Sequence, residues 1–463
     1  MTYPPTVRTA PQSAPTHAPG QPPDQPPAHR GAWSVGKERL RTAATTEPGR
    51  LQIIGAVLAA LVVAFGAVTA FEISDRATAA DDVVSRSQPL SADAASIYRS
   101  LADADTAASS SFLAGAAGSG AMDERYRKDV ALASRLLIKA ATNTDSSSES
   151  GRQIATLNEQ LPRYTGLIET ARANNRQGLP LGGAYLRYAN ARMTQDLLPA
   201  AQRLYDAETA RLDKDDEDAR FWPLFSLAVG VVALTGLVWA QRRNYRRTNR
   251  VFNHGLLAAT AASTVVLLWL AVGHTVARAD LNDATAHGQK SLKVLNDARI
   301  NSLKARANEN LTLVARGAVL TDDGKSDKYE TDYTTGMDRL GAQLSDAQKL
   351  ADDSAGRDPV AEAVKGVSEW KDRHSSASKT DKAGDYDGAL AKIIGSKAST
   401  GECFDQVDAA LEKALGHEQR EFTKAAEDGR GALTGLPIGA AALAVLGAAG
   451  AILGINRRLS EYR

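Results

Sequence analysis

Cysteine is nearly missing from this chain, since Cys403 is the one cysteine among 463 residues. A single cysteine excludes a disulfide within one chain and any cysteine-based metal cluster. We expect Cys403 to be a buried free thiol, with an intermolecular disulfide as the alternative. Aromatic residues are also scarce, at 5%, whereas alanine is very common. Because strands prefer aromatic and β-branched residues and alanine is the best helix former, this composition favours long helices over sheets.

An excess of charge of either sign is missing too. The chain has 55 Lys and Arg against 54 Asp and Glu, for a formal charge of +1. Nucleic-acid-binding domains normally carry a basic excess, so we predict no nucleic-acid partner. The basic segment between two of the apolar runs described below is too short to fold on DNA.

Catalytic motifs are absent from the sequence as well. There is no P-loop, no G-x-G-x-x-G after a strand, no kinase catalytic set, no H-E-x-x-H and no G-x-S-x-G. The seven histidines are scattered, and we interpret His287, His374 and His417 as isolated residues on helix surfaces. We therefore expect a protein that is not an enzyme and that has no catalytic residue, cofactor or metal ion.

Long apolar runs, in contrast, are plentiful. Four runs of about 20 residues each contain no Asp, Glu, Lys or Arg, and a run of that length spans a bilayer. The first begins 50 residues into the chain and is too long for a cleaved signal peptide. The predicted transmembrane helices are residues 51–71, 221–240, 255–277 and 433–455.

Basic residues between these runs indicate their orientation. The short segment 241–254 holds five arginines and no acidic residue: Arg242, Arg243, Arg246, Arg247 and Arg250. Short loops rich in Lys and Arg stay cytoplasmic. We therefore place this loop, the tail 1–50 and the tail 456–463 in the cytoplasm, and segments 72–220 and 278–432 outside the plasma membrane. The proline-rich tail 1–50 should be a disordered spacer, with docking of a partner as the alternative.

The order of segments repeats, and so do small details. Lys214-x-x-Glu217-Asp218-x-Arg220 precedes the second apolar run, and Lys424-x-x-Glu427-Asp428-x-Arg430 precedes the fourth. Pro223 and Pro437 lie near the starts of the same two runs. Such matches predict an internal duplication. We interpret the two prolines as hinges between stalk and span, with a proline merely tolerated at the span entrance as the alternative.

Apolar residues in the outside segments recur three or four positions apart, as in Ile154, Leu157 and Leu161, which is the period of an amphipathic helix. Breakers divide each segment into two long outer and two short inner helices. The predicted fold is an all-α membrane protein with four transmembrane helices and two extracytoplasmic antiparallel four-helix bundles in tandem. We expect the outer helices to continue into the spans, with a two-helix stalk below each bundle. The turn TNTDSSSESG, residues 142–151, should face the bilayer.

One stretch of the first outside segment, ARANNRQGLPLGGAYLRYAN at residues 171–190, is unusually polar and rich in helix breakers. Gln177-Gly178 should end the third helix, because glycine suits the left-handed position after a helix, and Pro180 should start the fourth. The turn would then lie at the tip farthest from the membrane. We predict that Asn174, Asn175, Arg176 and Gln177 form a docking surface there, with an ordinary helical turn as the alternative.

The arrangement of span, four-helix bundle and span resembles the extracytoplasmic sensor of bacterial chemoreceptors and sensor kinases, here doubled and without their cytoplasmic coiled coil. The stretch LIETARANNRQGLPLGGAYLRYANARMTQDLLPAAQRLY, residues 167–205, is similar to actinobacterial four-span transmembrane relays of the glutamine-binding-protein/kinase-G system. That resemblance implies amino-acid sensing. It also implies two partners, an extracytoplasmic solute-binding lipoprotein and a cytoplasmic serine/threonine kinase. The second half has no equivalent of NNRQG, so the two halves should not bind identically.

We therefore expect a signal relay in which helix shifts pass from the bundles through the spans. A non-switching envelope tether or scaffold is the first alternative, and a transporter accessory subunit is the second. The apolar runs carry no charged residue of the kind that substrate pathways usually need. The lipid bilayer is a further partner, and a homodimer is left open.

Overall fold

The computed structural model describes residues 45–118, 120–248, 253–395 and 397–459. Nearly all of these residues lie in helices, and the one β-bridge found among them is the isolated pair Leu320–Asp327. The all-α expectation is confirmed. Most of the predicted disordered tail falls outside the described residues, as does Arg250. The tail also ends earlier than expected, because the first helix begins at Glu47.

The first half is built on one very long helix, α2 (Glu47–Asp82), which passes through a π-helical turn at Val83–Ser87 into α3 (Gln88–Gly118). The chain then forms α4, α5, α6, a second π-turn, α7 and α8. Helices α3, α4, α5 and α6–α7 contact one another in a ring and form the first bundle. Their bounds are Gly120–Asn143 for α4, Glu149–Arg176 for α5, Leu181–Arg192 for α6, Met193–Leu197 for the π-turn, Leu198–Arg220 for α7 and Leu224–Thr248 for α8.

The second half follows the same plan. Its long helix α9 (His254–Asp283) passes through a π-turn at Ala284–Gln289 into α10 (Lys290–Ala315). Helices α10, α11, α12 and α14 contact one another in a ring and form the second bundle. A short extra helix, α13, was not expected from the sequence. The remaining bounds are Lys328–Leu350 for α11, Ser354–Lys382 for α12, Tyr386–Ile394 for α13, Thr400–Leu433 for α14 and Leu436–Leu459 for α15.

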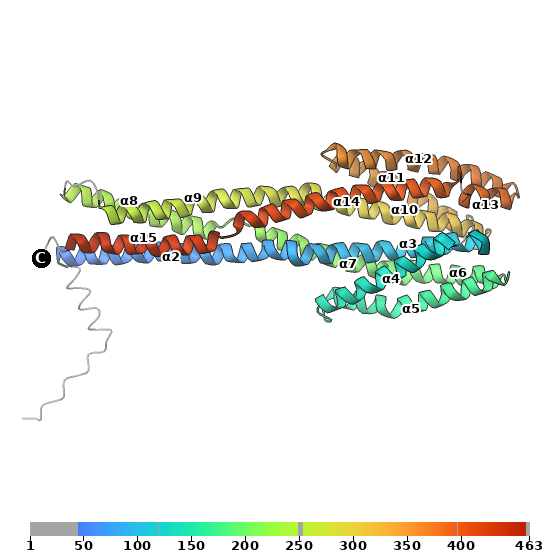
Figure 1. The fold of residues 1–463 in the computed structure, drawn as a ribbon, viewed down its shortest axis with the longest axis horizontal. Helices are drawn as coiled ribbons and strands as arrows, with labels where there is room; N and C mark the ends of the chain where they lie inside the picture. The colour runs from blue at the N-terminus through green and yellow to red at the C-terminus, as the bar shows by residue number, and fades with distance from the viewer. Residues whose placement is uncertain (1–44, 119, 249–252, 396, 460–463) are drawn as a thin grey trace, which may run out of the picture.

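The two bundles lie side by side and pack on each other through α3 and α10. One apolar core contains buried residues from both, among them Leu101, Leu186, Leu303 and Leu411. The turn between α4 and α5 faces the apolar end of the molecule, as expected, and the turn between α5 and α6 lies at the opposite tip (Figure 1). The bundles therefore behave as one body with a shared interface.

Below the bundles, the stalk contains four helices. Helix α2 contacts α7 and α14, and α9 contacts the same two helices. The expectation of a separate two-helix stalk below each bundle is wrong, because each pair buries apolar side chains against the other, including Ala80, Ala219, Ala277 and Leu281. The stalks of the two halves are joined along their length.

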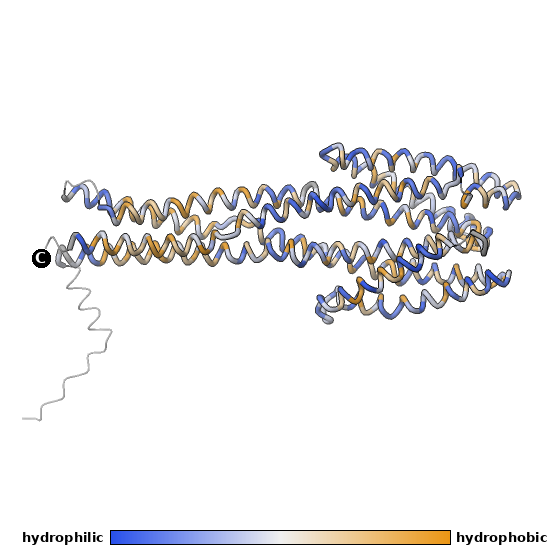
Figure 2. Tube along the Cα trace, in the orientation of Figure 1, coloured by the Kyte–Doolittle hydropathy of each residue, from blue (hydrophilic) through white to orange (hydrophobic). Residues whose placement is uncertain are grey.

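Four helical stretches are long and apolar enough to cross a membrane, which confirms the predicted number of spans. They fall within Gly49–Gly115, Leu181–Arg246, His254–Asp283 and Thr400–Arg457. Figure 2 shows apolar residues concentrated at the end formed by α2, α8, α9 and α15. The protein is a membrane protein whose bundles stand at the other end of the stalk.

Only two of the four spans continue directly from the stalk. Helix α7 ends at Arg220 and α8 begins at Leu224, while α14 ends at Leu433 and α15 begins at Leu436. The expected continuity of these helices is wrong. Pro223 disfavours a helical conformation in the residue before it. At the other break, Gly435 has φ = 80° and Pro437 lies in the first turn of α15, where its missing N–H is tolerated. Both prolines lie at helix breaks, and their hinge role stays a prediction.

Glycines allow α9 and α15 to approach closely within the membrane. A Cβ atom at Gly255 would lie 2.2 Å from the carbonyl oxygen of Gly450 and 2.5 Å from Cα of Gly454. Gly450 and Gly454 form a G-x-x-x-G pair, which here packs α15 against α9. We predict that Gly255→Ala destabilises the protein by about 1–2 kcal/mol through overpacking. A lower melting temperature of the detergent-solubilised chain would show this. Gly431→Ala, where a Cβ atom would contact nothing, should not lower it.

Candidate functional site: the tip and the clefts between the bundles

The structure brings only part of the predicted tip cluster to the surface. Helix α5 ends at Arg176 and Gly178 has φ = 67°, as expected for this turn. The Asn174 side-chain amide donates to the carbonyl oxygen of Thr170 at 2.8 Å. That of Asn175 donates to the carbonyl oxygen of Phe112 at 3.0 Å. Both asparagines are half-buried and hold the turn together, whereas Arg176 and Gln177 are exposed.

Apolar side chains at the tip are exposed beside this pair. Leu179 is 44% exposed, Leu181 58% and Tyr185 37%. Sequence analysis did not single them out, because an amphipathic helix in a bundle is expected to turn its apolar residues inward. We call Arg176, Gln177, Leu179, Leu181 and Tyr185 the tip surface. An exposed apolar group rimmed by polar residues is typical of a protein interaction site.

The arginines predicted to fix the topology lie at the far end of the molecule. Arg242, Arg243, Arg246 and the backbone of Arg247 belong to the last turns of α8. The guanidinium of Arg243 lies over the ring of Trp239, 5.4 Å from its centroid. The end of α8, the start of α9, the start of α2 and the end of α15 all lie at this same end (Figure 1). The helix ends that adjoin the segments predicted to be cytoplasmic therefore share one end of the molecule.

A cavity of about 670 Å³ lies between the two bundles. Helices α3, α6–α7, α10 and α11 line it, and we call it the cationic cleft. Its basic side chains are Arg187, Lys304, Lys328 and Arg339, and its acidic side chains are Asp105 and Asp332. The amides of Asn190, Asn301 and Asn308 also line it.

The acidic groups of the cationic cleft already have partners. Asp332 accepts from the Lys328 ammonium group at 2.8 Å. Asp105 is buried and accepts from the Asn190 amide at 2.7 Å and from the Tyr164 hydroxyl at 3.1 Å. Burial raises the pKa of Asp105 to about 6, although these hydrogen bonds act in the opposite direction. Asp105 and its two partners therefore link α3, α5 and α6 within the first bundle.

The basic groups are less well compensated. The Lys304 ammonium group donates to the Tyr98 hydroxyl at 3.0 Å, across the α3–α10 contact. Burial and the neighbouring positive charge of Arg339 both lower the pKa of Lys304. Among the residues that the structure describes, Arg187 and Arg339 have no hydrogen-bond or ion-pair partner. The cleft therefore combines cations from three helices with few available carboxylates.

A second cavity of about 470 Å³ lies on the other side of the α3–α10 contact, between α3, α4, α10 and α14. The first helices of the two bundles, α3 and α10, line both cavities. The cationic cleft is completed by α11 and α6–α7, and the second cavity by the corresponding helices α4 and α14. In this second cleft a carboxylate of the chain itself bridges the arginines. Asp408 of α14 accepts from Arg125 of the first bundle at 2.9 Å and from Arg299 of the second at 2.7 Å. We call it the bridged cleft.

The bridged cleft also holds carboxyl groups that lie close to one another. Arg125 donates to Asp103 at 2.8 Å. Burial and the nearby charge of Asp103 raise the pKa of Asp129 to about 8. The charged residues of the two bundles are thus connected directly in this cleft.

His374 is buried, contrary to the expectation that it lies on a helix surface. His374 of α12 is 6% exposed. Its Nδ1 atom lies 2.9 Å from Glu309, its Nε2 atom lies 3.2 Å from Glu330, and Tyr333 stacks on its ring. Glu309 also accepts from Arg306 at 2.5 Å and from the Trp370 indole at 3.2 Å. Periodicity did not reveal this cluster, because α10 is buried on more than one face.

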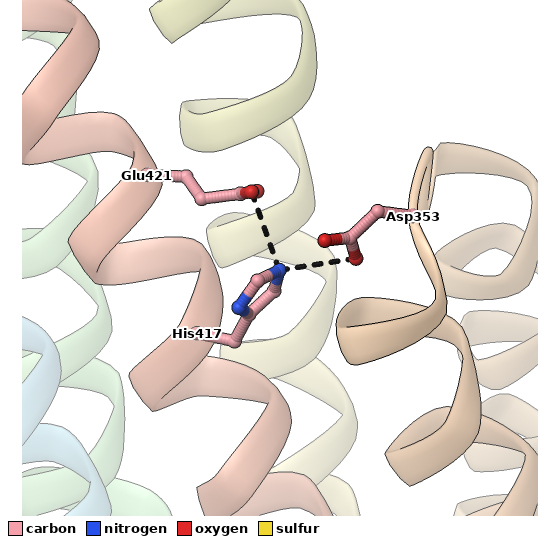
Figure 3. Close-up of side chains that lie close together, drawn as sticks. All are labelled: Asp353, His417 and Glu421. Atoms are coloured by element: carbon pink, nitrogen blue, oxygen red, sulfur yellow. Dashed lines mark hydrogen bonds and ion pairs between the residues drawn. The ribbon is translucent and has the colours of Figure 1, made fainter.

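His417 is also not isolated. Figure 3 shows its Nε2 atom between Asp353 and Glu421, at 3.1 and 3.3 Å. An imidazole and two carboxylates are ligand types that zinc accepts. However, Asp353 also accepts from the backbone N–H of Gly356 at 2.8 Å and caps α12. We interpret the group as a set of hydrogen-bonding side chains that holds the start of α12 against α14.

Sequence analysis missed the cleft residues altogether. Asn301, Lys304 and Asn308 recur three or four positions apart on α10, a spacing that places them on one helix face. No role was assigned to that face from the sequence, since nothing in the sequence indicates that the two bundles pair with each other. The missing information was the α3–α10 contact.

A family model matches one part of the first half of the chain. Residues 79–217, from the last turn of α2 to the last turn of α7, match the actinobacterial sensor domain. No curated protein and no solved structure matches the chain. The match covers the first bundle with its π-turns and leaves the second bundle uncovered. The chain is thus a membrane protein whose first bundle is similar to the actinobacterial sensor domain.

Proposed function

We propose that this protein is a signal relay across the plasma membrane. It couples an extracytoplasmic solute-binding lipoprotein, in response to amino acids, to a cytoplasmic serine/threonine kinase. The main structural support for this proposal is the pair of continuous helices α2–α3 and α9–α10. Each runs from the membrane end to its bundle and is interrupted only by a π-turn. The sensor-domain match supports the sensing role, and the arginine-rich end of α8 supports its orientation.

Contacts between α3 and α10 couple the two long helices that would carry the signal. Thr106 donates its hydroxyl to the carbonyl oxygen of Leu303 at 2.8 Å. The Asn310 amide donates to Ser110 at 2.8 Å and to Ser109 at 3.1 Å. A shift of one bundle therefore moves the long helix of the other. Packed helices change by small shifts between discrete arrangements, and such a shift of α3 and α10 would reach the inner ends of α2 and α9.

The tip surface is the proposed docking site for the lipoprotein. We predict that the triple variant Arg176→Ala, Gln177→Ala, Leu181→Ser reduces lipoprotein capture at least about 10-fold, since an interface loses several kcal/mol when central residues are removed. These side chains are exposed, so folding should be retained. Asn175 is left unchanged because it anchors the turn to α3. Arg163→Ala, on an exposed site of α5, is the matched control. Unchanged capture by the triple variant would exclude this docking site.

Affinity isolation of the full chain from native membranes tests the relay itself. Membranes are prepared with and without nutrient amino acids, and the bound proteins are identified. The proposal predicts recovery of a serine/threonine kinase and of a solute-binding lipoprotein, with the amount of kinase depending on the nutrient. Recovery of cell-wall or cell-division proteins alone would instead support an envelope tether.

A further inference from the structure

The cationic cleft carries a positive charge that the chain does not neutralise. Lys328 and Asp332 form a pair at 2.8 Å, and Asp105 is held by Asn190 and Tyr164. That leaves Arg187 from α6 and Arg339 from α11 without a carboxylate partner among the described residues. Lys304 from α10 forms no ion pair there, and the nearby carboxylate of Asp297 only partly offsets the effects that lower the pKa of Lys304. Burial and Arg339 lower the pKa of Lys304, so two of these cations disfavour each other. An anion placed between them would remove that cost.

The bridged cleft shows which group arginines bind when they line the corresponding cavity on the other side of the α3–α10 contact. There, one arginine from each bundle points at the carboxylate of Asp408. Corresponding helices line the cationic cleft, yet among the described residues no carboxylate there pairs with arginines of both bundles. Leu198 is the residue of α7 that lines this cleft. One cleft is closed by a carboxylate of the chain, and the other presents arginines from both bundles to an open cavity.

Size and polarity fit a small organic anion. The cavity of about 670 Å³ lies within the range of about 300–1,000 Å³ typical of small-molecule sites. The side-chain amide of Asn308 on α10 offers neutral N–H donors beside the cations. That of Asn301 donates one N–H group to Gln343 and has a second one. Guanidinium groups bind carboxylates through two parallel hydrogen bonds. Arg187 and Arg339 are contributed by different bundles, which suits a ligand with an acidic group at each end.

The geometry points to a binding site for a small dicarboxylate in the cationic cleft. One carboxylate pairs with Arg187 of the first bundle, and the other pairs with Arg339 and Lys304 of the second. The ligand then contacts both bundles and favours the arrangement in which these cations face each other, which is the differential binding that a switch needs. The inference deepens the proposed sensing function and rests on it.

Isothermal titration calorimetry of the full chain in lipid nanodiscs tests the site. Succinate and L-glutamate serve as dicarboxylate probes, butyrate as a single carboxylate and inorganic phosphate as a different anion. We expect a dicarboxylate to bind, and butyrate to bind at least about 10-fold more weakly, because one charge-assisted contact is lost. Absence of binding by both dicarboxylates would overturn the assignment. So would binding of phosphate without either of them.

Charge-removing variants locate the binding. Arg187→Gln and Arg339→Gln should each weaken dicarboxylate binding at least about 10-fold. Neither arginine has a hydrogen bond within the described residues, so both variants should fold. Arg163→Gln removes the same charge from an exposed site of α5 and should leave binding unchanged. Dicarboxylate binding that both cleft variants retain would place the ligand elsewhere and contradict the inference.

Calorimetry measures ligand binding alone, whereas kinase recovery from membranes tests the relay. A chain that recovers the kinase in a nutrient-dependent manner but binds no dicarboxylate keeps the relay and loses the cleft site. A chain that binds succinate in the cleft but recovers no kinase keeps the cleft site and loses the relay.

Discussion

Replacing Glu309 with glutamine is expected to destabilise the second bundle by about 3–5 kcal/mol, the cost of removing one member of a buried charge cluster. Glu309 is 0% exposed and lies against Arg306, His374 and Trp370. Glutamine keeps the shape of the side chain but removes the negative charge that compensates the positive charges of Arg306 and His374. Thermal unfolding of the full chain in detergent, followed by circular dichroism, should show a clearly lower melting temperature.

A matched control is available in the same bundle. Glu402 forms an ion pair with Arg373 at 2.8 Å, but its side chain is 42% exposed. Exposed pairs contribute at most about 1 kcal/mol, so Glu402→Gln should change the melting temperature little. Equal effects of the two variants would show that the buried cluster has no special role in stability.

The same cluster predicts a loss of stability at alkaline pH. Burial alone would lower the pKa of His374, but its hydrogen bonds with Glu309 and Glu330 outweigh burial and raise the pKa to about 9. A histidine pKa raised above its unfolded value stabilises the fold fully below about pH 6.5, and the contribution disappears as pH rises through about 9. The expected loss is about 3 kcal/mol. His374→Gln should abolish this pH dependence, and a native profile that is flat from pH 6 to 10 would contradict it.

Replacing Asp408 with alanine should cost about 2–4 kcal/mol and weaken the contact between the bundles, because it removes the carboxylate that Arg125 and Arg299 share. Asp408 is 7% exposed. Arg125 would retain Asp103, and Arg299 would retain the exposed Glu412, so the cost falls short of that at Glu309. Limited proteolysis and the melting temperature should both report a looser pair of bundles.

Asp405 provides the control for that experiment. It lies one helical turn from Asp408, 3.7 Å from Arg125, and its side chain is 63% exposed. Asp405→Ala should therefore leave stability almost unchanged. A comparable loss in both variants would mean that Asp408 does not link the bundles.

Local sequence patterns were sufficient for the spans, the helix period and the turn at Gly178. Each of these depends on a short stretch of chain, such as an apolar run or a glycine with positive φ. Cys403 was also interpreted correctly as a buried free thiol. The breaks before α8 and α15 show the limit of that approach: Pro223 and Pro437 were noticed, but the apolar pattern continues across them and hid the break.

Tertiary pairing was not available from the sequence. His374 was interpreted as a surface residue because its partners, Glu309 and Glu330, lie on other helices at sequence distances of 65 and 44. The clefts depend on the pairing of α3 with α10, which no periodicity encodes. The tip was placed correctly, yet Asn174 and Asn175 hold its turn together. The exposed apolar side chains lie after them, Leu179 in the turn and Leu181 and Tyr185 on the next helix.

The most direct test of the relay measures the distance between the inner ends of α2 and α9. Gln52→Cys and His254→Cys place nitroxide labels at exposed positions there, and buried Cys403 is shielded from labelling. Pulsed electron–electron double resonance in nanodiscs then measures the distance between the labels in the doubly labelled chain and in the same chain carrying Asp408→Ala or Asp405→Ala. A relay predicts that loosening the bundles through Asp408→Ala shifts the distance distribution at the inner ends, while Asp405→Ala leaves it unchanged. Identical distributions in all three proteins would show that the bundles and the inner ends are not coupled, and would contradict the relay.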